Sequence, residues 1–504
     1  MRLLTPTTMM PNATPNLRSL LCAIGFAALS GGNALAQTAP PTPTPASPAA
    51  HAAAARVGAQ LEGHVLLPAA TFVKPPADAP PHLALSGRFL HPDGRRRDTP
   101  GAVPGIAFLS DPKAPRPTGM NGPFEGQPVQ GFSGIKWQKD GSAWVLSDNG
   151  YGSRANSPDA MLMFHHVRPE WAGGRLIVQR TVFLHDPDGL VPFNIANAGN
   201  SKRYLTGADF DIESIQIVGD SFWFGDEFGP YLLRADRNGR VTGVFETRVD
   251  GQLVRSPDHF GVSAPALPGA ALAASLNVNV RRSRGFEGMA SSPDGRFLYP
   301  MLEGPLWDAA TKAWEARDGK ETVRILEFDV QREAYTGRSM RYQLELAGNN
   351  IGDFNMIDAN TALVIERDNG EGDAARACVG AARPDCFNVP ARFKRVYKID
   401  LSQVDAQGFV RKLAYIDLLD IADPKNLSRV AGATVAGRFS FPHWCIEGLD
   451  IVDADHIVVL NDNNLTVSAA REFGKNEDNE VILLRVPELL RAKWRRRRSA
   501  PAHP

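Results

Sequence analysis

Pairs of acidic residues recur around a series of short β-hairpins that the sequence predicts. In the stretch 209–229, DFDIESIQIVGDSFWFGDEFG, two apolar strands flank a turn at Gly219, as is typical of an antiparallel hairpin. Glu213 lies at the start of the first strand, and Asp226 and Glu227 lie at the end of the second. Because a hairpin brings its two open ends together, we expect these carboxylates to be neighbours.

The same pattern occurs in four other stretches, 131–150, 285–304, 351–369 and 446–464. We call the residue near the start of each hairpin its opening residue and the acid at its end its closing residue. The predicted opening residues are Ser133, Glu213, Glu287, Asp353 and Glu447, and the predicted closing residues are Asp148, Glu227 with Asp226 before it, Glu303, Glu366 and Asp462. The closing residues are 63 to 96 residues apart, so each interval has room for two further strands.

This spacing predicts an all-β protein, a β-propeller with five to six blades of four antiparallel strands. The first strand of each blade lines the axis of a propeller, so equivalent residues of all blades converge there. Only one further strand, 481–486, follows the last hairpin. We therefore expect the N-terminal part to supply the missing outer strand, with 87–91 and 106–110 as candidates, and to leave no free edge in the ring.

The carboxylates would then share one end of the central channel. Like charges within about 4–6 Å raise each other's pKa values, and a hard divalent cation would relieve that repulsion. Calcium takes six to eight oxygen ligands, whereas zinc is less suitable because these positions hold no histidine cluster. We predict a calcium site with the ligands Asp148, Glu213, Asp226, Glu227, Glu303, Glu366 and Asp462, to which Asn149, Asn369, Asn463 and Asn464 would add neutral oxygens.

Other side chains near the predicted site have candidate roles in catalysis and substrate binding. Glu287 and Glu447 are the candidate catalytic carboxylates, and His443, four residues before Glu447, is a candidate acid or base. Arg367 and Arg154 each lie close to a closing residue and are candidate phosphate-binding groups, because a guanidinium can donate two parallel hydrogen bonds to phosphate oxygens. A purely structural role is the alternative for each acid, because Asp and Asn are also ordinary turn residues.

The N-terminal end of the chain has features that point to export, and the C-terminal end is strongly basic. Residues 1–36 hold two arginines, an apolar run at 20–29 and a small-residue site that predicts cleavage after Ala36. The run is shorter than the roughly 20 residues of a membrane span, and no other candidate span is found; a disordered cytoplasmic leader is the alternative. The predicted order is a signal peptide (1–36), a Pro/Ala-rich disordered spacer (37–60), the propeller domain (85–490) and a basic tail (491–504), which is either solvated or in contact with an anionic surface.

Composition and cysteine content agree with a periplasmic or secreted protein. The 504 residues balance 55 Lys and Arg against 55 Asp and Glu, which gives no sign of a nucleic-acid partner. Cys378 and Cys386 are eight residues apart and are expected to form a disulfide in an oxidising compartment. Cys445 is expected to remain a buried thiol, with a nucleophilic role as the alternative.

The motifs GFSGIKW with WVLSDNG, DIESI with FWFGDEFGPYLLR, GFEGMA, IGDFNMID with LVIERDN, and IEGLDIV with LNDNN together resemble a known family. It is the phytase-like family, described as "esterase-like activity of phytase", and the resemblance covers about residues 85–490. The resemblance implies a secreted or periplasmic propeller related to calcium-dependent hydrolases of inositol phosphates. The basic phosphate-binding cluster of calcium phytases has no match in this sequence.

Three functions remain open from the sequence. The first is an exported, calcium-dependent hydrolase of small-molecule phosphoesters, for which Arg or Lys should converge on the acids. The second is an esterase or lactonase of the same architecture, in which a metal ion polarises a carbonyl; a serine mechanism is disfavoured because no G-x-S-x-G motif is present. The third is a non-catalytic, metal-stabilised binding propeller.

Overall fold

The structure is a computed structural model that describes residues 54–262 and 278–493. All described residues belong to one compact unit. The predicted signal peptide, most of the predicted spacer and the tail from residue 494 lie outside the described residues.

Five antiparallel hairpins form at the five predicted stretches. In each stretch two runs of mainly apolar residues are separated by a short turn. Each hairpin places its first strand beside the first strands of two other hairpins. The first strands are β7 (Phe132–Trp137), β11 (Ile212–Val218), β17 (Phe286–Ser291), β24 (Asn350–Met356) and β31 (Cys445–Ile451). The second strands are β8 (Ala143–Ser147), β12 (Ser221–Asp226), β18 (Phe297–Leu302), β25 (Thr361–Arg367) and β32 (His456–Asp462).

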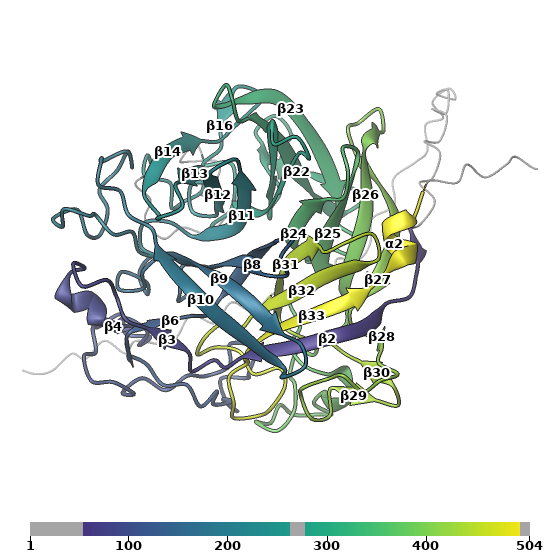
Figure 1. The fold of residues 1–504 in the computed structure, drawn as a ribbon, viewed down its shortest axis with the longest axis horizontal. Helices are drawn as coiled ribbons and strands as arrows, with labels where there is room; N and C mark the ends of the chain where they lie inside the picture. The colour runs from purple at the N-terminus through teal and green to yellow at the C-terminus, as the bar shows by residue number, and fades with distance from the viewer. Residues whose placement is uncertain (1–53, 263–277, 494–504) are drawn as a thin grey trace, which may run out of the picture. The chain divides into compact units, whose positions relative to one another are not determined.

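Outer strands extend each hairpin into a sheet of antiparallel strands. They are β9 (Met163–Glu170) and β10 (Arg175–Phe183), β13 (Tyr231–Ala235) and β14 (Val241–Glu246), β22 (Lys320–Asp329) and β23 (Ala334–Gln343), β26 (Lys394–Val404) and β27 (Val410–Asp417), and β33 (Asn479–Arg485). The first strands contact one another in the closed order β7, β11, β17, β24, β31 and back to β7. Within the described residues this ring has five blades, which confirms the predicted propeller (Figure 1).

The hydrophobic core lies between neighbouring blades. Leu363 and Ile365 of β25 belong to the same buried cluster as Ile446 and Leu449 of β31. Phe164 of β9 belongs to a cluster that also contains buried residues of β11 and β12. Each sheet therefore buries apolar side chains against the next one, which stabilises the fold by about 25 cal/mol for each Å² of apolar surface buried. This packing fixes where the first strands meet.

The N-terminal part closes the ring, as expected, but through a different segment. β2 (Gln60–Leu67) pairs antiparallel with β33 and is the outer strand of the fifth blade; in Figure 1 the purple β2 lies beside the yellow β33. The candidate segments 87–91 and 106–110 were wrong, because both lie outside this sheet. Leu61, Val65 and Leu67 of β2 are buried, so this strand contributes apolar side chains that the two candidate segments do not.

Two predicted boundaries also need correction. The spacer was expected to run to residue 60, but β1 (Ala55–Arg56) pairs with β27 and β2 begins at Gln60. The propeller was expected to begin at residue 85, but it includes β2. Composition alone predicted disorder here, whereas the open edges of β27 and β33 offer backbone hydrogen bonds that order the segment.

Short elements in the loops complete the fold. They are β3 (Phe72–Val73), η1 (Pro81–Ala84), β4 (Leu85–Ser86), β5 (Phe124–Glu125), β6 (Gln127–Pro128), β15 (Arg248–Val249), β16 (Gln252–Leu253), β19 (Trp307–Asp308), β20 (Ala313–Trp314), β21 (Ala316–Arg317), η2 (Ala374–Arg376), β28 (Ile421–Ala422), β29 (Thr434–Val435), β30 (Arg438–Phe439) and α2 (Pro487–Arg491). Among the described residues, no helix is both long enough and apolar enough to cross a membrane.

The cysteines occupy two different environments. Cys378 and Cys386, in the loop between β25 and β26, form a disulfide with their Cα atoms 5.0 Å apart. Cys445 at the start of β31 is a free, buried thiol.

We expect closure by β2 to contribute strongly to stability. Leu61 is fully buried in the core cluster between the fourth and fifth blades, so Leu61→Ala should lower the free energy of unfolding by about 2–5 kcal/mol. Leu66→Ala, on the same strand but only half-buried, is the matched control and should cost clearly less. Urea denaturation measures both, and equal losses would contradict the tight packing of β2.

Candidate metal centre

Each of the five hairpins carries a β-bulge at the same place beside the axis. In the second blade Ile212 pairs with Asp226 and Ser214 pairs with Gly225, so Glu213 is left out of the ladder. The same shift occurs at the start of β7, β17, β24 and β31. A bulge re-aims the side chain of the extra residue, and here it does so in all five blades at one end of the axis.

A cavity of about 220 Å³ lies where the open ends of the hairpins meet. It is lined by eight carboxylates, two guanidinium groups, a thiol and several amides. The carboxylates are those of Asp148, Asp211, Glu213, Glu227, Glu287, Glu303, Glu447 and Asp462, and the other named groups are those of Arg284, Arg367, Cys445, Asn149, Asn350, Asn369 and Asn464. Seven of the eight acids are buried and Asp148 is half-buried.

The strand register shows that the fourth blade contributes a cation instead of an acid. In every blade, the cavity is lined by the residue that follows the second-strand partner of the position just before the bulge. These partners are Ser147, Asp226, Leu302, Glu366 and Asn461, and the residues after them are Asp148, Glu227, Glu303, Arg367 and Asp462. Glu366 pairs with Ile351, so the predicted alignment of this hairpin was displaced by one residue. The true closing residue is Arg367.

The same displacement applies to the opening residue of the fourth blade. Gly352, not Asp353, occupies the position of Glu213. A Cβ atom on Gly352 would lie 1.9 Å from the carbonyl oxygen of Ile446, so close approach of β31 excludes any side chain there. Asp353 is buried away from the cavity and accepts a hydrogen bond from the Leu449 N–H at 2.8 Å.

Arg367 links the carboxylates of the two neighbouring blades. Its Nη2 lies 2.5 Å from Oε1 of Glu447 and 3.9 Å from the Oε1 atoms of both Glu287 and Glu303. Arg284 forms a short ion pair with Glu303. Four buried atoms of cavity-lining side chains have no hydrogen-bond partner among the described residues: Oδ1 of Asp211, Oε1 of Glu287, Nε of Arg367 and Nδ2 of Asn464.

Three groups of ligand atoms are close enough to hold a metal ion, each with its atoms within 4.8 Å of one another. Two of them share Glu227, so this carboxylate lies between two adjacent cation positions. The groups are Asp211, Glu213 and Glu227; Glu227, Glu287 and Glu303; and Cys445, Glu447 and Asp462. The first two offer only oxygen donors, which is the donor set that calcium prefers, and Oε1 of Glu287 has no other partner among the described residues and could serve as one of them.

Burial is the main cause of raised pKa values in this cavity, and neighbouring carboxylates add to it. Burial and the charges of nearby acids hold the pKa values of Glu213, Glu227, Glu287 and Asp462 well above their ordinary range. Burial raises the pKa of Asp211 to about 6. The cavity therefore favours protonated acids unless a cation replaces the protons.

Two predicted metal ligands, Asp226 and Glu366, do not line the cavity. Asp226 accepts hydrogen bonds from the N–H groups of Asp211 and Gly229, at 2.8 and 2.7 Å. It therefore positions the backbone that carries Asp211 and Glu227. Successive residues of a strand point to opposite sides, so only one of the adjacent pair Asp226 and Glu227 can face the axis.

Glu366 is the second correction to the predicted ligand set. Its carboxylate is fully buried on the outer side of β25, 2.7 Å from both the Tyr342 hydroxyl and Nζ of Lys412. It also accepts a hydrogen bond from the amide of Asn349. These partners, which come from the third and fourth blades, satisfy the carboxylate outside the cavity, so no cation is needed there.

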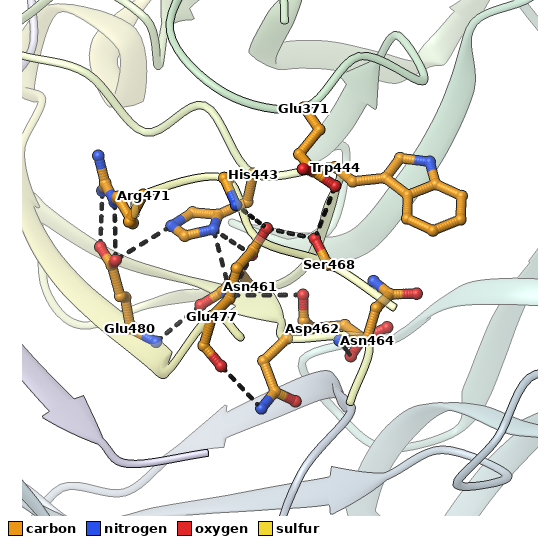
Figure 2. A network of polar contacts seen from close by, with 12 residues as sticks. Glu371, His443, Trp444, Asn461, Asp462, Asn464, Ser468, Arg471, Glu477 and Glu480 are labelled. Carbon is orange, nitrogen blue, oxygen red and sulfur yellow. Dashed lines mark hydrogen bonds and ion pairs between the residues drawn. The ribbon is translucent and has the colours of Figure 1, made fainter. Parts of the chain in front are cut away.

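His443 does not line the cavity and so does not fit its predicted catalytic role. Figure 2 shows its ring directed toward Glu477 and Glu480, on the other side of the chain from Trp444. Nδ1 forms a short ion pair with Glu477, and Nε2 lies 3.3 Å from Oε1 of Glu480, which Arg471 also binds. Burial lowers the pKa of His443, but these two carboxylates outweigh it and raise the pKa above its ordinary value.

Arg154 also lies elsewhere. Its Nε and Nη1 donate to the carbonyl oxygens of Ala208 and Asp258, each at 2.8 Å, and it lines a separate depression together with His259. The guanidinium thus holds two loops together. Of the two predicted phosphate-binding groups, only Arg367 lines the cavity.

Two charged cavity residues were missed in the sequence, Asp211 and Arg284. Asp211 lies two residues before Glu213, and this spacing in a strand places both side chains on one side. Asp211 falls inside the stretch 209–229 and Arg284 directly precedes the stretch 285–304, but neither occupies a predicted opening or closing position.

A family model described as "Phytase-like: Esterase-like activity of phytase" matches residues 127–465. Over 127 residues the sequence is 28% identical to an uncharacterized secreted protein of Arthroderma benhamiae, covering 24% of this chain and 24% of that protein. The chain thus spans about a quarter of that curated relative.

Solved structures also match at low similarity. A protein of unknown function from Dyadobacter fermentans has a TM-score of 0.36 and 8% identity, covering 85% of this chain and 99% of that one. The PQQ-bound aldose sugar dehydrogenase of Streptomyces coelicolor has a TM-score of 0.30 and 10% identity, covering 71% and 94%. The propeller assignment rests on the strand pairing described above.

We expect the chelated protein to lose stability as the pH rises from 5 to 8. A carboxyl whose pKa is raised on folding stabilises the fold below its unfolded pKa, and this contribution is lost as the pH rises through the folded pKa, which is about 6 for Asp211. The melting temperature in chelator should therefore fall over this range. Excess calcium should reduce the fall, because it stabilises the ionised acids. A melting temperature independent of both pH and calcium would contradict the acidic cavity.

Removing the internal counter-charge should have two opposite effects. Arg367→Gln leaves three carboxylates without their guanidinium partner, so the chelated variant should lose on the order of 3 kcal/mol of stability. Its calcium affinity, measured by calorimetry, should rise, because the cavity becomes more negative. Arg154→Gln, outside the cavity, is the control and should leave calcium affinity unchanged. Weaker calcium binding by Arg367→Gln would contradict this role.

Proposed function

Because this chain belongs to the phytase-like family, we propose that it is an exported, calcium-dependent hydrolase of small-molecule phosphoesters. The proposal is carried by the two sets of three carboxylates that have Glu227 in common. Beside them lie Oε1 of Glu287 and Nε of Arg367, which have no hydrogen-bond partner among the described residues. Oxygen donors for a cation and a guanidinium for an anion thus lie in one cavity. The secreted relative supports export.

Each part of the cavity has a role in this proposal. Asp211, Glu213, Glu227, Glu287 and Glu303 hold calcium. Bound calcium supplies positive charge for the phosphate oxygens and lowers the pKa of a coordinated water. The protein's own residues orient the substrate and accept the proton of the attacking water.

Arg367 is the proposed phosphate-orienting group, because its Nε has no other partner among the described residues and its side chain lines the cavity. Glu447 is the proposed general base. Its carboxylate is held by Nη2 of Arg367 at 2.5 Å and by the hydroxyl of Ser133 at 3.3 Å, so it is oriented from two neighbouring blades. A base must lie within hydrogen-bond reach of the proton that it removes, and Glu447 lines the same cavity as the proposed calcium ligands.

An esterase or lactonase of the same architecture is the second candidate. One observation favours it: both guanidinium groups in the cavity are already ion-paired with Glu303 and Glu447, which leaves less positive charge for a dianionic phosphate than for a neutral ester. In that case the cation would polarise a carbonyl.

Hydrolysis of p-nitrophenyl phosphate and p-nitrophenyl acetate, each with calcium and with chelator, separates these functions. The proposal expects calcium-dependent release of p-nitrophenol from the phosphate. Turnover of the acetate alone would favour the esterase. No turnover of either, with calcium still raising the melting temperature, would indicate a non-catalytic binding propeller.

Glu287→Gln should lower calcium affinity at least about tenfold, since it removes one charged ligand from the group around Glu227. Glu366→Gln is the matched control: the substitution is the same and the side chain is equally buried, but it lies outside the cavity. It should reduce stability while leaving calcium affinity unchanged. Calorimetric titration measures both, and equal affinities in the parent and Glu287→Gln would sink the proposed ligand set.

A further inference from the structure

An apolar cleft of about 510 Å³ adjoins the acidic cavity. Its apolar lining includes Leu90, Val103, Ile106, Phe108, Leu465 and Val467. Among its described lining residues, Asp148 is the only carboxylate, and there is no Lys, Arg or His. The cleft is formed by the loops that precede β7 and follow β8 and β32, together with Trp444 just before β31. The first of these loops includes the segments 87–91 and 106–110 that do not close the ring.

The cleft and the acidic cavity are continuous. Asp148, Gly152, Trp444 and Asn464 line both of them. Phe108 stacks on Trp444, with ring centroids 5.1 Å apart and an interplanar angle of 3°. A backbone hydrogen bond of 2.8 Å from the Phe108 N–H to the Val467 carbonyl oxygen holds this loop in place.

Phe108 is unusually exposed for an aromatic residue. It remains 69% exposed and Ile106 remains 37% exposed, although both line the cleft. Stacked and exposed apolar rings beside a polar site are typical of a ligand subsite, where the apolar part of the ligand completes the packing.

We propose that this cleft is a substrate subsite that receives an aromatic group, so that the substrate is an aryl phosphate monoester whose phosphate lies in the acidic cavity. The inference rests on the proposed function and names its substrate class. Trp444 and Asp148 mark the junction, so the ester oxygen lies there and the ring extends along Phe108 and Ile106.

The charges around the cleft favour this class over an inositol polyphosphate. Among the described lining residues of both cavities, the Lys and Arg side chains are Arg284 and Arg367, and both are ion-paired. A second or third phosphate would therefore lie against apolar side chains without counter-charge, which is costly. An aromatic ring in the same place would bury only apolar surface against the protein, which favours binding.

Binding of two non-hydrolysable probes, phenylphosphonate and methylphosphonate, tests the inference by calorimetry in the presence of calcium. The phenyl compound should bind with a Kd at least about tenfold lower, because its ring occupies the cleft. Phe108→Ser should reduce this preference to about twofold and leave the Kd of methylphosphonate unchanged. Ile106→Thr should reduce it by a smaller factor. Both substitutions are at exposed positions, so both variants are expected to fold.

Leu346→Ser, at an exposed position outside both cavities, is the control and should keep the full preference for the phenyl compound. Equal affinities of the two probes in the parent would overturn the aromatic subsite but not the phosphoesterase. A preference that persists in both cleft variants would overturn it as well, because the ring would then bind elsewhere. If neither probe binds with calcium, the proposed function fails and the subsite fails with it.

Discussion

Charge repulsion at the centre of the ring is the constraint on which the rest of the site depends. Eight carboxylates line one cavity with two guanidinium groups, and most of these acids are buried. Burial and mutual repulsion raise several of their pKa values. Some of these acids are therefore protonated unless a cation compensates their charge. Arg367 is placed where it relieves the most repulsion, between Glu447 and the pair Glu287 and Glu303. The cavity therefore combines oxygen donors with guanidinium groups, which is the basis of the proposed function.

A single backbone device, repeated five times, creates this arrangement. The β-bulge at the start of each first strand turns the opening residue out of the ladder. The end of the second strand, directly beside it, supplies the closing residue. The fourth blade departs from the pattern because β31 approaches too closely at Gly352. The blade that cannot supply an opening acid is also the blade that supplies Arg367.

Two features surround the acidic cavity: a buried polar network that reaches the closing strand β2, and an apolar cleft. β2 closes the fifth blade, and His64 on β2 lies 3.0 Å from Glu480 in the buried network that also holds His443. The strand that seals the ring is thus tied to the residues behind the cavity. On the other side, the loop that carries Phe108 forms the apolar cleft, so polar chemistry and apolar recognition lie side by side.

The sequence by itself determined the propeller, the five hairpins and most of the acidic cavity, because turn residues and alternating apolar residues act locally. It also indicated that the N-terminal part closes the ring. Tertiary structure decided what depends on pairing between distant segments: β2 as the closing strand, and the register that replaces Glu366 by Arg367. It also decided that His443 lies behind the cavity, since a residue close in sequence to Glu447 can point into a different layer. A strand pattern gives the period of the side chains, but a shift of one residue changes which of them faces the axis, and only packing against the neighbouring blades fixes that shift.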